Sequence, residues 1–304
     1  MIRIQNLSKS YGEKLVLKGL NIEIEEGKVF GLVGINGAGK STLLRLISGV
    51  LKADEGIILI DDENVYDNPS AKNKIFFLPD EPYYSTDTTP ANLIDLYKEF
   101  YNVNEHVYFE YLDYFKLPKT KHLKTFSKGM KRQTFISLAL AIKPKYLLLD
   151  EAFDGLDPLA RLAFKRAVIE TVENKETTII ISSHSLRELE DICDCYGLID
   201  NMEIASSGEI RDEICKVHKY QVAFTEVPVK EKFNVEFLQY QQEGRIIRVV
   251  VREDLEKFEE IMSYYNALLI DEIPIDFEEL FILQVENRGY LKWLKCLNMN
   301  LRKI

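Results

Sequence analysis

The sequence has no run of about 18 or more consecutive apolar residues, so nothing in its 304 residues is expected to span a bilayer by itself. Its first residues, MIRIQNLSKSYG, are charged and polar where a secretory signal needs an apolar core, and we therefore expect a cytosolic chain. The net charge of -10 argues against general electrostatic adhesion to nucleic acid, although it leaves room for a local basic patch.

Cysteine is scarce as well, and its spacing argues against a zinc site. Cys193, Cys195, Cys215 and Cys296 lack the paired spacing of zinc ligands, and a cytosolic protein keeps its thiols reduced. We interpret them as structural or incidental. The composition, 46% hydrophobic and 29% charged, is that of a globular chain long enough for one large domain and a smaller one.

What the sequence does contain is an alternation of strand-like and helical segments through its first two-thirds. The strand-like segments, among them KVFGLVG, GIILID, YLLLDE and TTIIISS, are nearly continuous apolar runs, which is typical of parallel strands buried on both faces. The pattern predicts an α/β fold. Residues 88–127 carry mostly helical periodicity and predict a helical subdomain that interrupts the strand pattern.

The pattern of predicted strands and helices changes beyond about residue 207. KYQVAF, VEFLQYQ and RIIRVVV predict strands, DLEKFEEIMSYY predicts an amphipathic helix, and ALLIDEIPIDFEELFILQVEN predicts a strand followed by a helix. We therefore predict two domains, 1–210 and 211–304, with a small α+β accessory domain as the second. The boundary is expected between residues 208 and 218.

Three glycines stand between a predicted strand and a predicted helix in FGLVGINGAGKSTLLRLI, residues 30–47. Residues 34–41, GINGAGKS, match the phosphate-binding loop pattern of two glycines, a lysine and a hydroxyl. Glycines let backbone N–H groups converge on phosphate oxygens, and the positive end of the following helix helps to hold negative charge. The motif predicts that Lys40 reaches the β- and γ-phosphates and that Ser41 binds Mg²⁺. The agreement of strand, loop and helix disfavours a glycine-rich turn with a chance lysine.

A second candidate site lies at YLLLDEAFDGLDP. A hydrophobic strand that delivers Asp150 to its C-terminal end puts a carboxylate next to the bound Mg²⁺, and the adjacent Glu151 can polarise an attacking water. Because strand ends often carry solvated acids, Asp150 and Glu151 indicate a site mainly in combination with the phosphate-binding loop upstream. Together the two motifs favour nucleotide hydrolysis.

These motifs, with FSKGM at residues 126–130, stand in an order that resembles an ATP-binding cassette (ABC) protein. FSKGM is similar to the signature loop of that family, usually leucine-serine-glycine-glycine-glutamine, with Lys128 and Met130 replacing the third and fifth residues and Ser127 and Gly129 retained. In the family this loop completes the nucleotide site of a facing cassette. The resemblance, which covers residues 1–210 and rests on six ordered motifs, therefore implies two subunits that sandwich two ATP molecules and a P-loop NTPase core with antiparallel β and helical subdomains.

Further residues carry over from the resemblance one position at a time. Tyr11 resembles the aromatic that stacks on adenine, with an ordinary strand-edge tyrosine as the alternative. His184 resembles the switch histidine that contacts the γ-phosphate, and Asp157 the aspartate that communicates across the dimer. Glu151 is implied as general base or water-positioner. The implied nucleotide contacts in the phosphate loop are Asn36, Gly37, Ala38, Gly39, Lys40, Ser41 and Thr42.

One position departs from the family pattern. The family has a glutamine after the strand that leads into the helical subdomain, whereas IFFLPDEPYY offers Asp80 and then Glu81. Asp80 is the nearest match, and we expect it to bind Mg²⁺ or its water while altering the coupling of nucleotide to transport. The acidic residue at position 80, the Lys-Gly-Met form of the signature loop and the GLDP sequence resemble those of the type 2 exporter branch of the family. The accessory domain is similar to C-terminal extensions of drug, lantibiotic and peptide exporter ATPases in that branch.

The resemblance implies an ATP-binding and hydrolysing subunit of an exporter, with ATP and Mg²⁺ as cofactors and Ser41, Asp80 and Asp150 as metal contacts. Since no segment spans a bilayer, we expect a separate integral membrane permease that docks near residues 80–101. We also expect a second cassette, identical or paralogous, no nucleic acid, and a peripheral place at the cytoplasmic face of the membrane. An amphipathic peptide or an antibiotic is the expected substrate.

Two other function classes stay open. One is a soluble ABC ATPase that acts on ribosomes, in repair or in cluster assembly; the absence of a second cassette and of a long coiled coil, and the acidic balance, disfavour it. The other is a regulatory module that holds ATP without turning it over, against which Glu151 argues.

Two local features also keep two interpretations each. The aromatic residues Tyr83, Tyr84, Tyr97, Phe100 and Tyr101 predict either a permease interface or packing within the helical subdomain. The basic stretch 288–304, RGYLKWLKCLNMNLRKI, predicts a short amphipathic helix that meets either protein or a membrane surface.

Overall fold

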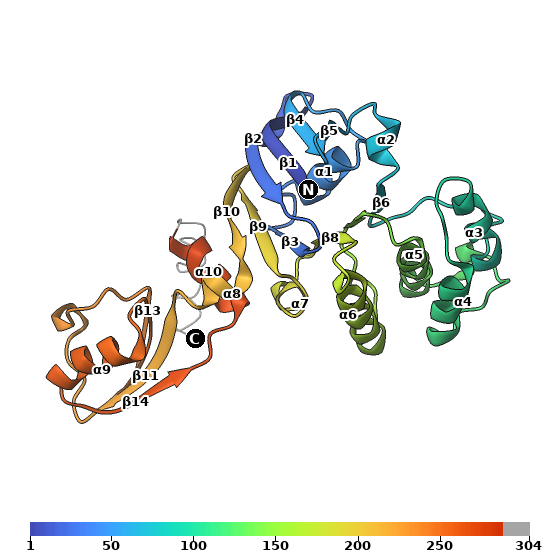
Figure 1. The fold of residues 1–304 in the computed structure, drawn as a ribbon. Helices are drawn as coiled ribbons and strands as arrows, with labels where there is room; N and C mark the ends of the chain where they lie inside the picture. Colours follow the sequence, from blue (N-terminus) through green and yellow to red (C-terminus); the bar gives the residue numbers. More distant parts are fainter. Residues whose placement is uncertain (288–304) are drawn as a thin grey trace. The chain divides into compact units, whose positions relative to one another are not determined.

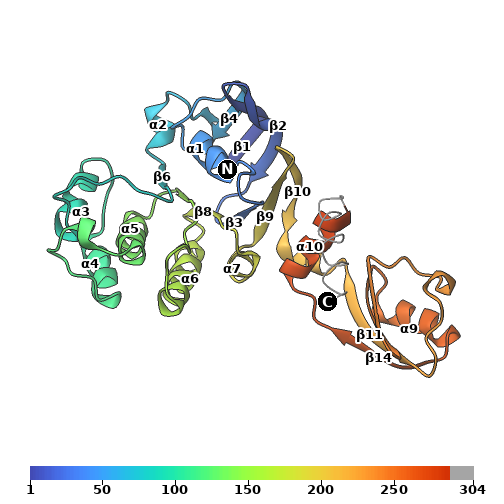
Figure 2. The ribbon, with the colours of Figure 1, turned by 180° about the vertical axis from the view of Figure 1, so that it is seen from behind.

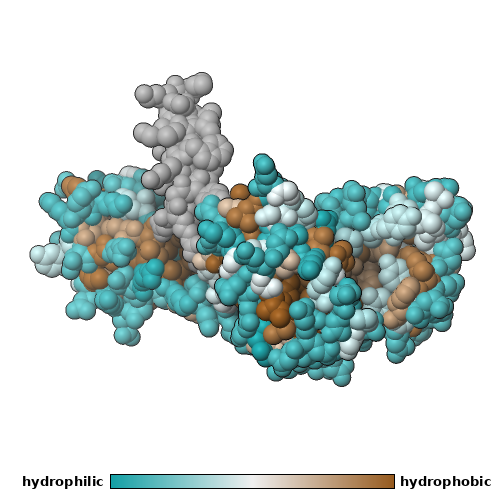
Figure 3. All heavy atoms as spheres, turned by 90° about the horizontal axis from the view of Figure 1, so that it is seen from above, coloured by the Kyte–Doolittle hydropathy of each residue, from teal (hydrophilic) through white to brown (hydrophobic). Residues whose placement is uncertain are grey.

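The computed structural model describes residues 1–287 and divides the chain into two compact units, Met1–Gly208 and Glu209–Ile304 (Figure 1). The predicted amphipathic helix at 288–304 and Cys296 lie outside the described residues. Within residues 1–287, no helix is both long and apolar enough to cross a membrane. Figure 3 shows hydrophilic side chains over much of the face that it draws, with apolar ones in separate patches.

The N-terminal unit contains a six-stranded sheet in the order β10-β9-β3-β8-β7-β6. Strands β3, β8 and β7 are buried at every residue, and β3 pairs in parallel with both β8 and β9, as β7 does with β6 and β8. The near-continuous apolar runs follow from this burial on both faces. The strands are β3 (Val29–Val33), β6 (Ile75–Leu78), β7 (Tyr146–Leu149), β8 (Thr178–Ser182), β9 (Cys195–Asp200) and β10 (Glu203–Glu209).

A second sheet of the same unit is antiparallel where its pairing is described, in the order β2-β1-β4-β5. Its strands are β1 (Ile2–Tyr11), β2 (Lys14–Ile24), β4 (Glu55–Ile60) and β5 (Glu63–Asn64). The sequence grouping of GIILID with the parallel strands is wrong, because this segment is β4, which alternates between buried and accessible residues and runs antiparallel to β1. A strand with one buried face needs apolar residues only at every second position, and a short run cannot reveal that partner.

Helices of the N-terminal unit connect these strands. They are α1 (Lys40–Ile47), α2 (Pro69–Lys72), α3 (Pro90–Lys98), α4 (Glu105–Tyr114), the 3₁₀ turn η1 (Leu123–Thr125), α5 (Lys128–Ile142), α6 (Pro158–Val172) and α7 (Leu186–Glu190). Helix α1 lies between the two sheets, since its leucines share one core with residues of β1, β2, β7 and β8. Figures 1 and 2 show α3, α4 and α5 together as a helical arm, and α5 is also in contact with α6.

Polar caps fix the start of each helix in the arm. Thr89 and Asn92 form a reciprocal capping box on α3, Asn104 caps α4, and Ser127 caps α5. Tyr108 is completely buried and donates a hydrogen bond from its hydroxyl to the Pro90 carbonyl at 2.9 Å. Such caps are each worth about 1 kcal/mol, which matters for an arm built of short helices.

The aromatic residues of the arm separate into two sets. Tyr97 and Tyr101 pack on Phe76 of β6 with ring centroids 5.8 and 5.4 Å away, and the Tyr101 hydroxyl donates to the Ile75 carbonyl. Tyr83 and Phe100, by contrast, are 90% and 69% exposed. Packing therefore accounts for the first two rings but leaves the other two without a covering neighbour among residues 1–287.

Asp61, in the turn after β4, is the centre of a cluster of charged and polar groups that lie at or just before the starts of other strands. Its carboxylate accepts hydrogen bonds from the Tyr146 hydroxyl (2.5 Å), Lys145 Nζ (2.9 Å), the N-terminal ammonium (3.0 Å) and Lys74 Nζ (3.1 Å). Burial by itself raises the pKa of Asp61, but these four donors outweigh it and hold the pKa well below its usual value.

The C-terminal unit is built on an antiparallel sheet in the order β12-β13-β11-β14. Helix α9 packs on it, and Phe258 of the helix stacks on Tyr220 of the sheet with centroids 4.3 Å apart. The elements are α8 (Ile210–Ile214), β11 (His218–Phe224), the 3₁₀ turn η2 (Lys230–Lys232), β12 (Gln239–Glu243), β13 (Ile246–Val251), α9 (Leu255–Tyr264), β14 (Ala267–Ile273) and α10 (Phe277–Asn287).

Candidate functional site

The glycine-rich loop lies where the sequence predicts it, between the buried strand β3 and helix α1. Gly39 has a φ of 107° and caps the helix; a Cβ at this position would lie 2.6 Å from a methyl of Leu17, so only glycine fits. Lys40 is only 5% exposed, and its ammonium donates to the carbonyls of Gly34 (2.8 Å) and Ile35 (3.4 Å). The loop thus holds its own lysine at the helix N-terminus, where α1 favours negative charge.

A pocket of about 450 Å³ opens over this loop, within the size range of small-molecule sites. Its lining includes Tyr11, the last residue of β1, which is 46% exposed. Residues that line it are Tyr11, Lys14, Val16, Asn36, Gly37, Gly39, Lys40, Ser41, Thr42 and Glu151. The structure therefore brings Tyr11 and Glu151 to the same pocket as the phosphate loop.

Asp150 follows β7 and is 1% exposed. Its Oδ1 accepts hydrogen bonds from Ser41 Oγ at 3.0 Å and from Ser182 Oγ at 2.7 Å. Ser182 Oγ in turn accepts from the backbone N–H of Glu151 at 2.9 Å. Sequence reasoning missed Ser182, whose only signal is its place at the end of β8, the strand between β3 and β7.

Glu151 lies between two cationic or basic groups. Its Oε2 is 2.9 Å from Nδ1 of His184, and its Oε1 is 3.6 Å from Nζ of Lys40. The backbone of Glu151 has a φ of 48°, in the left-handed region that a residue with a Cβ rarely adopts. Of the predicted catalytic residues, Glu151 is thus in contact with both Lys40 and His184.

A hydroxyl and a carboxylate side by side, Ser41 and Asp150, suit Mg²⁺, which is usually held by one or two protein oxygens together with phosphate oxygens and water. Among residues 1–287 there is no cluster of three or more histidine, cysteine, aspartate or glutamate side chains that would hold a metal ion. This donor set fits a hard cation shared with a phosphate and does not fit a cation enclosed by protein.

Asp80 lies outside this group, at the end of β6. Its Oδ1 is 3.0 Å from Nη2 of Arg132 and 3.6 Å from Nζ of Lys128. Lys128 also pairs with Asp154; this hydrogen bond raises the pKa of Lys128 and lowers that of Asp154. A second pocket, of about 420 Å³, opens here and is lined by Asp80, Glu81, Pro82, Tyr84, Lys128, Lys131 and Arg132.

Arg132 is a second residue that sequence reasoning missed. It is 2% exposed, and burial lowers the pKa of its guanidinium, a shift that Asp80 and other carboxylates oppose. Arg132 stands in KGMKRQT directly after Lys131, and in the sequence both side chains look equally like solvated charges on a helix. Only the fold shows that this side chain turns inward.

Ser127, Gly129 and Asp157 each make a local contact that stabilises the start of a helix or allows close packing. Ser127 Oγ accepts from the N–H of Met130 at 3.2 Å, and Asp157 Oδ1 accepts from two N–H groups at the start of α6. A Cβ on Gly129 would lie 2.3 Å from the carbonyl oxygen of Gly155. Ser127, Gly129 and Asp157 are not among the described residues that line the phosphate-loop pocket.

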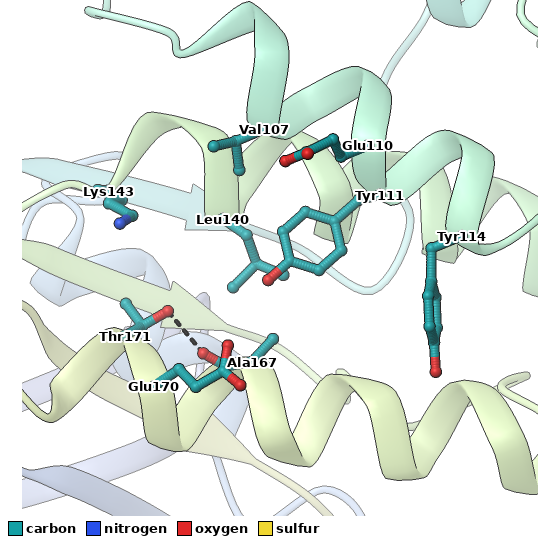
Figure 4. A pocket seen from close by; sticks show the side chains of 9 residues that line it. All are labelled: Val107, Glu110, Tyr111, Tyr114, Leu140, Lys143, Ala167, Glu170 and Thr171. Atoms are coloured by element: carbon teal, nitrogen blue, oxygen red, sulfur yellow. Dashed lines mark hydrogen bonds between the residues drawn. The ribbon is translucent and has the colours of Figure 1, made fainter.

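A further hollow of about 320 Å³ lies between α4, α5 and α6 (Figure 4). Tyr111 and Tyr114 of α4 stand on one side of it and Glu170 and Thr171 of α6 on the other, with the Thr171 hydroxyl bonded to the Ala167 carbonyl. It contains none of the predicted site residues.

Comparison with known proteins gives consistent results. The family model described as ABC transporter matches residues 17–154. The ABC transporter ATP-binding protein YtrB of Bacillus subtilis is 31% identical over 93% of this chain and 97% of its own length, and the linearmycin resistance ATP-binding protein LnrL of the same organism is 36% identical over 70% of each chain. A solved structure of an ATP-binding subunit of an ABC transporter superposes with a TM-score of 0.64 at 28% identity, covering 70% of this chain and 91% of that one.

Proposed function

The chain belongs to the family of ABC transporter ATP-binding proteins, an ATPase family, and from that premise we propose that it hydrolyses Mg·ATP with Glu151 as the residue that activates water. The observation that carries this proposal is the direct contact of Glu151 with both Lys40 and His184 beside the Ser41–Asp150 pair. These groups stand where a γ-phosphate on the loop would meet water.

Each residue then has a distinct task. Lys40 leaves its own loop carbonyls to neutralise the β- and γ-phosphates, because a phosphate oxygen is a stronger acceptor than a carbonyl. Ser41 and Asp150 hold Mg²⁺, which supplies charge neutralisation on the phosphates. Glu151 orients the water and accepts its proton, and His184 contacts the γ-phosphate while keeping Glu151 in place. Tyr11 stacks on the adenine, and the loop residues Asn36, Gly37, Ala38, Gly39 and Thr42 complete the cradle.

The reaction also needs a second cassette. Ser127 and Gly129 are not among the described residues that line the phosphate-loop pocket of their own chain, which supports a role toward the nucleotide of a facing cassette, with Asp157 at the contact between the two. The family resemblance implies Asp80 as a contact of the metal or its water, whereas its ion pair with Arg132 supports a different role that is argued below. The intact set of motifs permits two identical cassettes or a paralogous pair.

ATP-binding subunits of this family act with membrane permease subunits, and we infer the docking region and the substrate. The region is residues 80–101, where Tyr83 and Phe100 expose large apolar surfaces. The chain would then be peripheral to the cytoplasmic face of the membrane. An amphipathic peptide or an antibiotic is the substrate class, supported by the relative named for linearmycin resistance.

The test is Mg²⁺-dependent ATP hydrolysis by the purified chain and by Glu151→Gln, with the oligomeric state followed in ATP. Loss of a positioned general base lowers turnover about 10²–10⁴-fold, and we expect Glu151→Gln to show this loss and to accumulate as an ATP-bound dimer. The control is Glu170→Gln, the same chemical change in the hollow of Figure 4, which should keep the wild-type rate. Wild-type turnover by Glu151→Gln would contradict the proposed role. If the wild type binds ATP without hydrolysing it, the assay is repeated with the co-expressed permease.

A further inference from the structure

Arg132 is a buried cation whose contacts all lead to the hydrolysis site or to the strand end beside it. Its Nη2 donates to the carbonyls of Asp150 (3.0 Å) and Glu151 (2.7 Å), and its Nη1 donates to the carbonyl of Pro79 (2.9 Å). Nη2 also donates to Oδ1 of Asp80 at 3.0 Å, the one carboxylate oxygen among these acceptors. A rigid guanidinium fork with several donors is suited to such a task, and a lysine ammonium is not.

Glu151 needs this support because its backbone is strained. With a φ of 48°, the peptide groups on either side of it must be held by the surroundings. Its N–H donates to Ser182 Oγ at 2.9 Å, and its carbonyl accepts from Arg132 at 2.7 Å and from the N–H of Asp154 at 3.0 Å. Removal of Arg132 takes away the shorter of the two hydrogen bonds to this carbonyl and leaves it with the Asp154 N–H. The Glu151 carboxylate would then lose its fixed place between Lys40 and His184.

Asp80 supplies what the buried guanidinium requires. A cation that is 2% exposed needs a compensating charge, and the side chain of Asp80, 40% exposed, provides it at hydrogen-bond distance. A neutral amide at position 80 would leave the arginine with carbonyl acceptors only. The acid that departs from the family glutamine is therefore matched, on this chain, by a buried arginine.

We propose that Asp80 and Arg132 form a positioning pair for hydrolysis, in which Asp80 holds Arg132 and Arg132 holds the backbone of Glu151. The inference rests on the proposed function of Glu151. It assigns the carboxylate of Asp80 to a protein cation instead of Mg²⁺. Since Asp80 begins the segment that leads into the helical arm, the pair also ties the arm to the catalytic glutamate.

The test is a double-mutant cycle of Asp80→Asn and Arg132→Gln, with kcat, KM for ATP and the Mg²⁺ concentration for half-maximal rate measured for each. Misplacement of a catalytic group by about 1 Å can cost about 100-fold in rate, so we expect Arg132→Gln to lower kcat by up to about 100-fold with little change in KM. Asp80→Asn should lower kcat as well, and the double variant should be no slower than Arg132→Gln alone. Lys131→Gln removes a neighbouring charge that lies over the ring of Tyr84 and should stay within about twofold of wild type.

Two outcomes overturn the inference. If Asp80→Asn raises the Mg²⁺ requirement in both backgrounds, Asp80 serves the metal; if both single variants hydrolyse ATP at the wild-type rate while Glu151→Gln is inactive, the pair has no positioning role. Should Arg132→Gln fail to fold, Asp80→Glu against Asp80→Asn still decides, since restored kcat with glutamate supports the pair and equal rates refute it. Activity of Glu151→Gln would instead count against the proposed function.

Discussion

Replacement of Ser182 with alanine tests whether β8 holds the two hydrolysis residues together. Ser182 is completely buried, and its hydroxyl both donates to Oδ1 of Asp150 at 2.7 Å and accepts from the N–H of Glu151 at 2.9 Å. The alanine variant removes both bonds and leaves a buried N–H without this acceptor. Asp150 keeps its bond from Ser41.

The expected loss of stability follows from these two bonds. A hydrogen bond to a charged carboxylate contributes about 1.5–3 kcal/mol and a neutral one about 0.5–1.5 kcal/mol, so Ser182→Ala should lose about 2–4.5 kcal/mol. For a folding unit of about 200 residues this corresponds to a fall in melting temperature of roughly 4–18 °C. Turnover should fall as well, because Asp150 and Glu151 lose a shared anchor.

The matched control is Ser137→Ala. Ser137 is also completely buried, but its hydroxyl only donates back to the Gln133 carbonyl within α5, so its loss should change stability by less than about 1 kcal/mol. Melting followed by circular dichroism and steady-state ATP hydrolysis give the two readouts. Equal melting temperatures for the two alanine variants, with wild-type turnover in both, would refute the argument.

Two further predictions concern pH and close packing. Because the pKa of Asp61 is held below its usual value in the folded chain, its contribution to stability is full above about pH 4 and is lost as the pH falls below it; melting of Asp61→Asn should depend less on pH between about 5 and 3 than that of the wild type, and parallel curves would contradict this. Gly129→Ala places a Cβ 2.3 Å from the Gly155 carbonyl oxygen, so we expect the free energy of unfolding, measured by heat or urea, to fall by about 1–3 kcal/mol. An unchanged midpoint would show that the start of α5 and the segment around Gly155 separate freely.

Sequence reasoning found the parts of the site that depend on local chemistry. The phosphate loop needs glycines next to a buried strand and a helix N-terminus, so its residue types and its place can be recognised together. Asp150 at the end of β7 can be recognised together with this loop, although an acid after a buried strand is by itself only moderate evidence of a site. Both patterns can be recognised in the sequence without knowing which strands are neighbours in the sheet.

Ser182 and Arg132 were missed because their roles depend on pairing that the sequence does not state. Strand β8 lies between β3 and β7 although it follows both in the chain, and only this order puts Ser182 next to Asp150. Arg132 lies on a helix with little difference in polarity between its faces, and its burial results from the approach of the β6 and β7 ends. The antiparallel pairing of β4 with β1 could not be predicted for a similar reason, since the sequence does not state which strands are neighbours.

The position of β3 in its sheet also bears on how the protein is made. Both neighbours of β3 come much later in the chain, since Val33 ends β3 and roughly 145 residues follow before Thr178 begins β8. At a synthesis rate of about 5–20 residues per second, the VFGLV strand waits on the ribosome for about 7–30 s with neither edge paired. An apolar strand with open edges is prone to pair with other chains. The phosphate loop that follows β3 is therefore synthesised well before the two strands that flank β3 in the folded sheet, and during that interval the apolar strand is open to pairing with other chains.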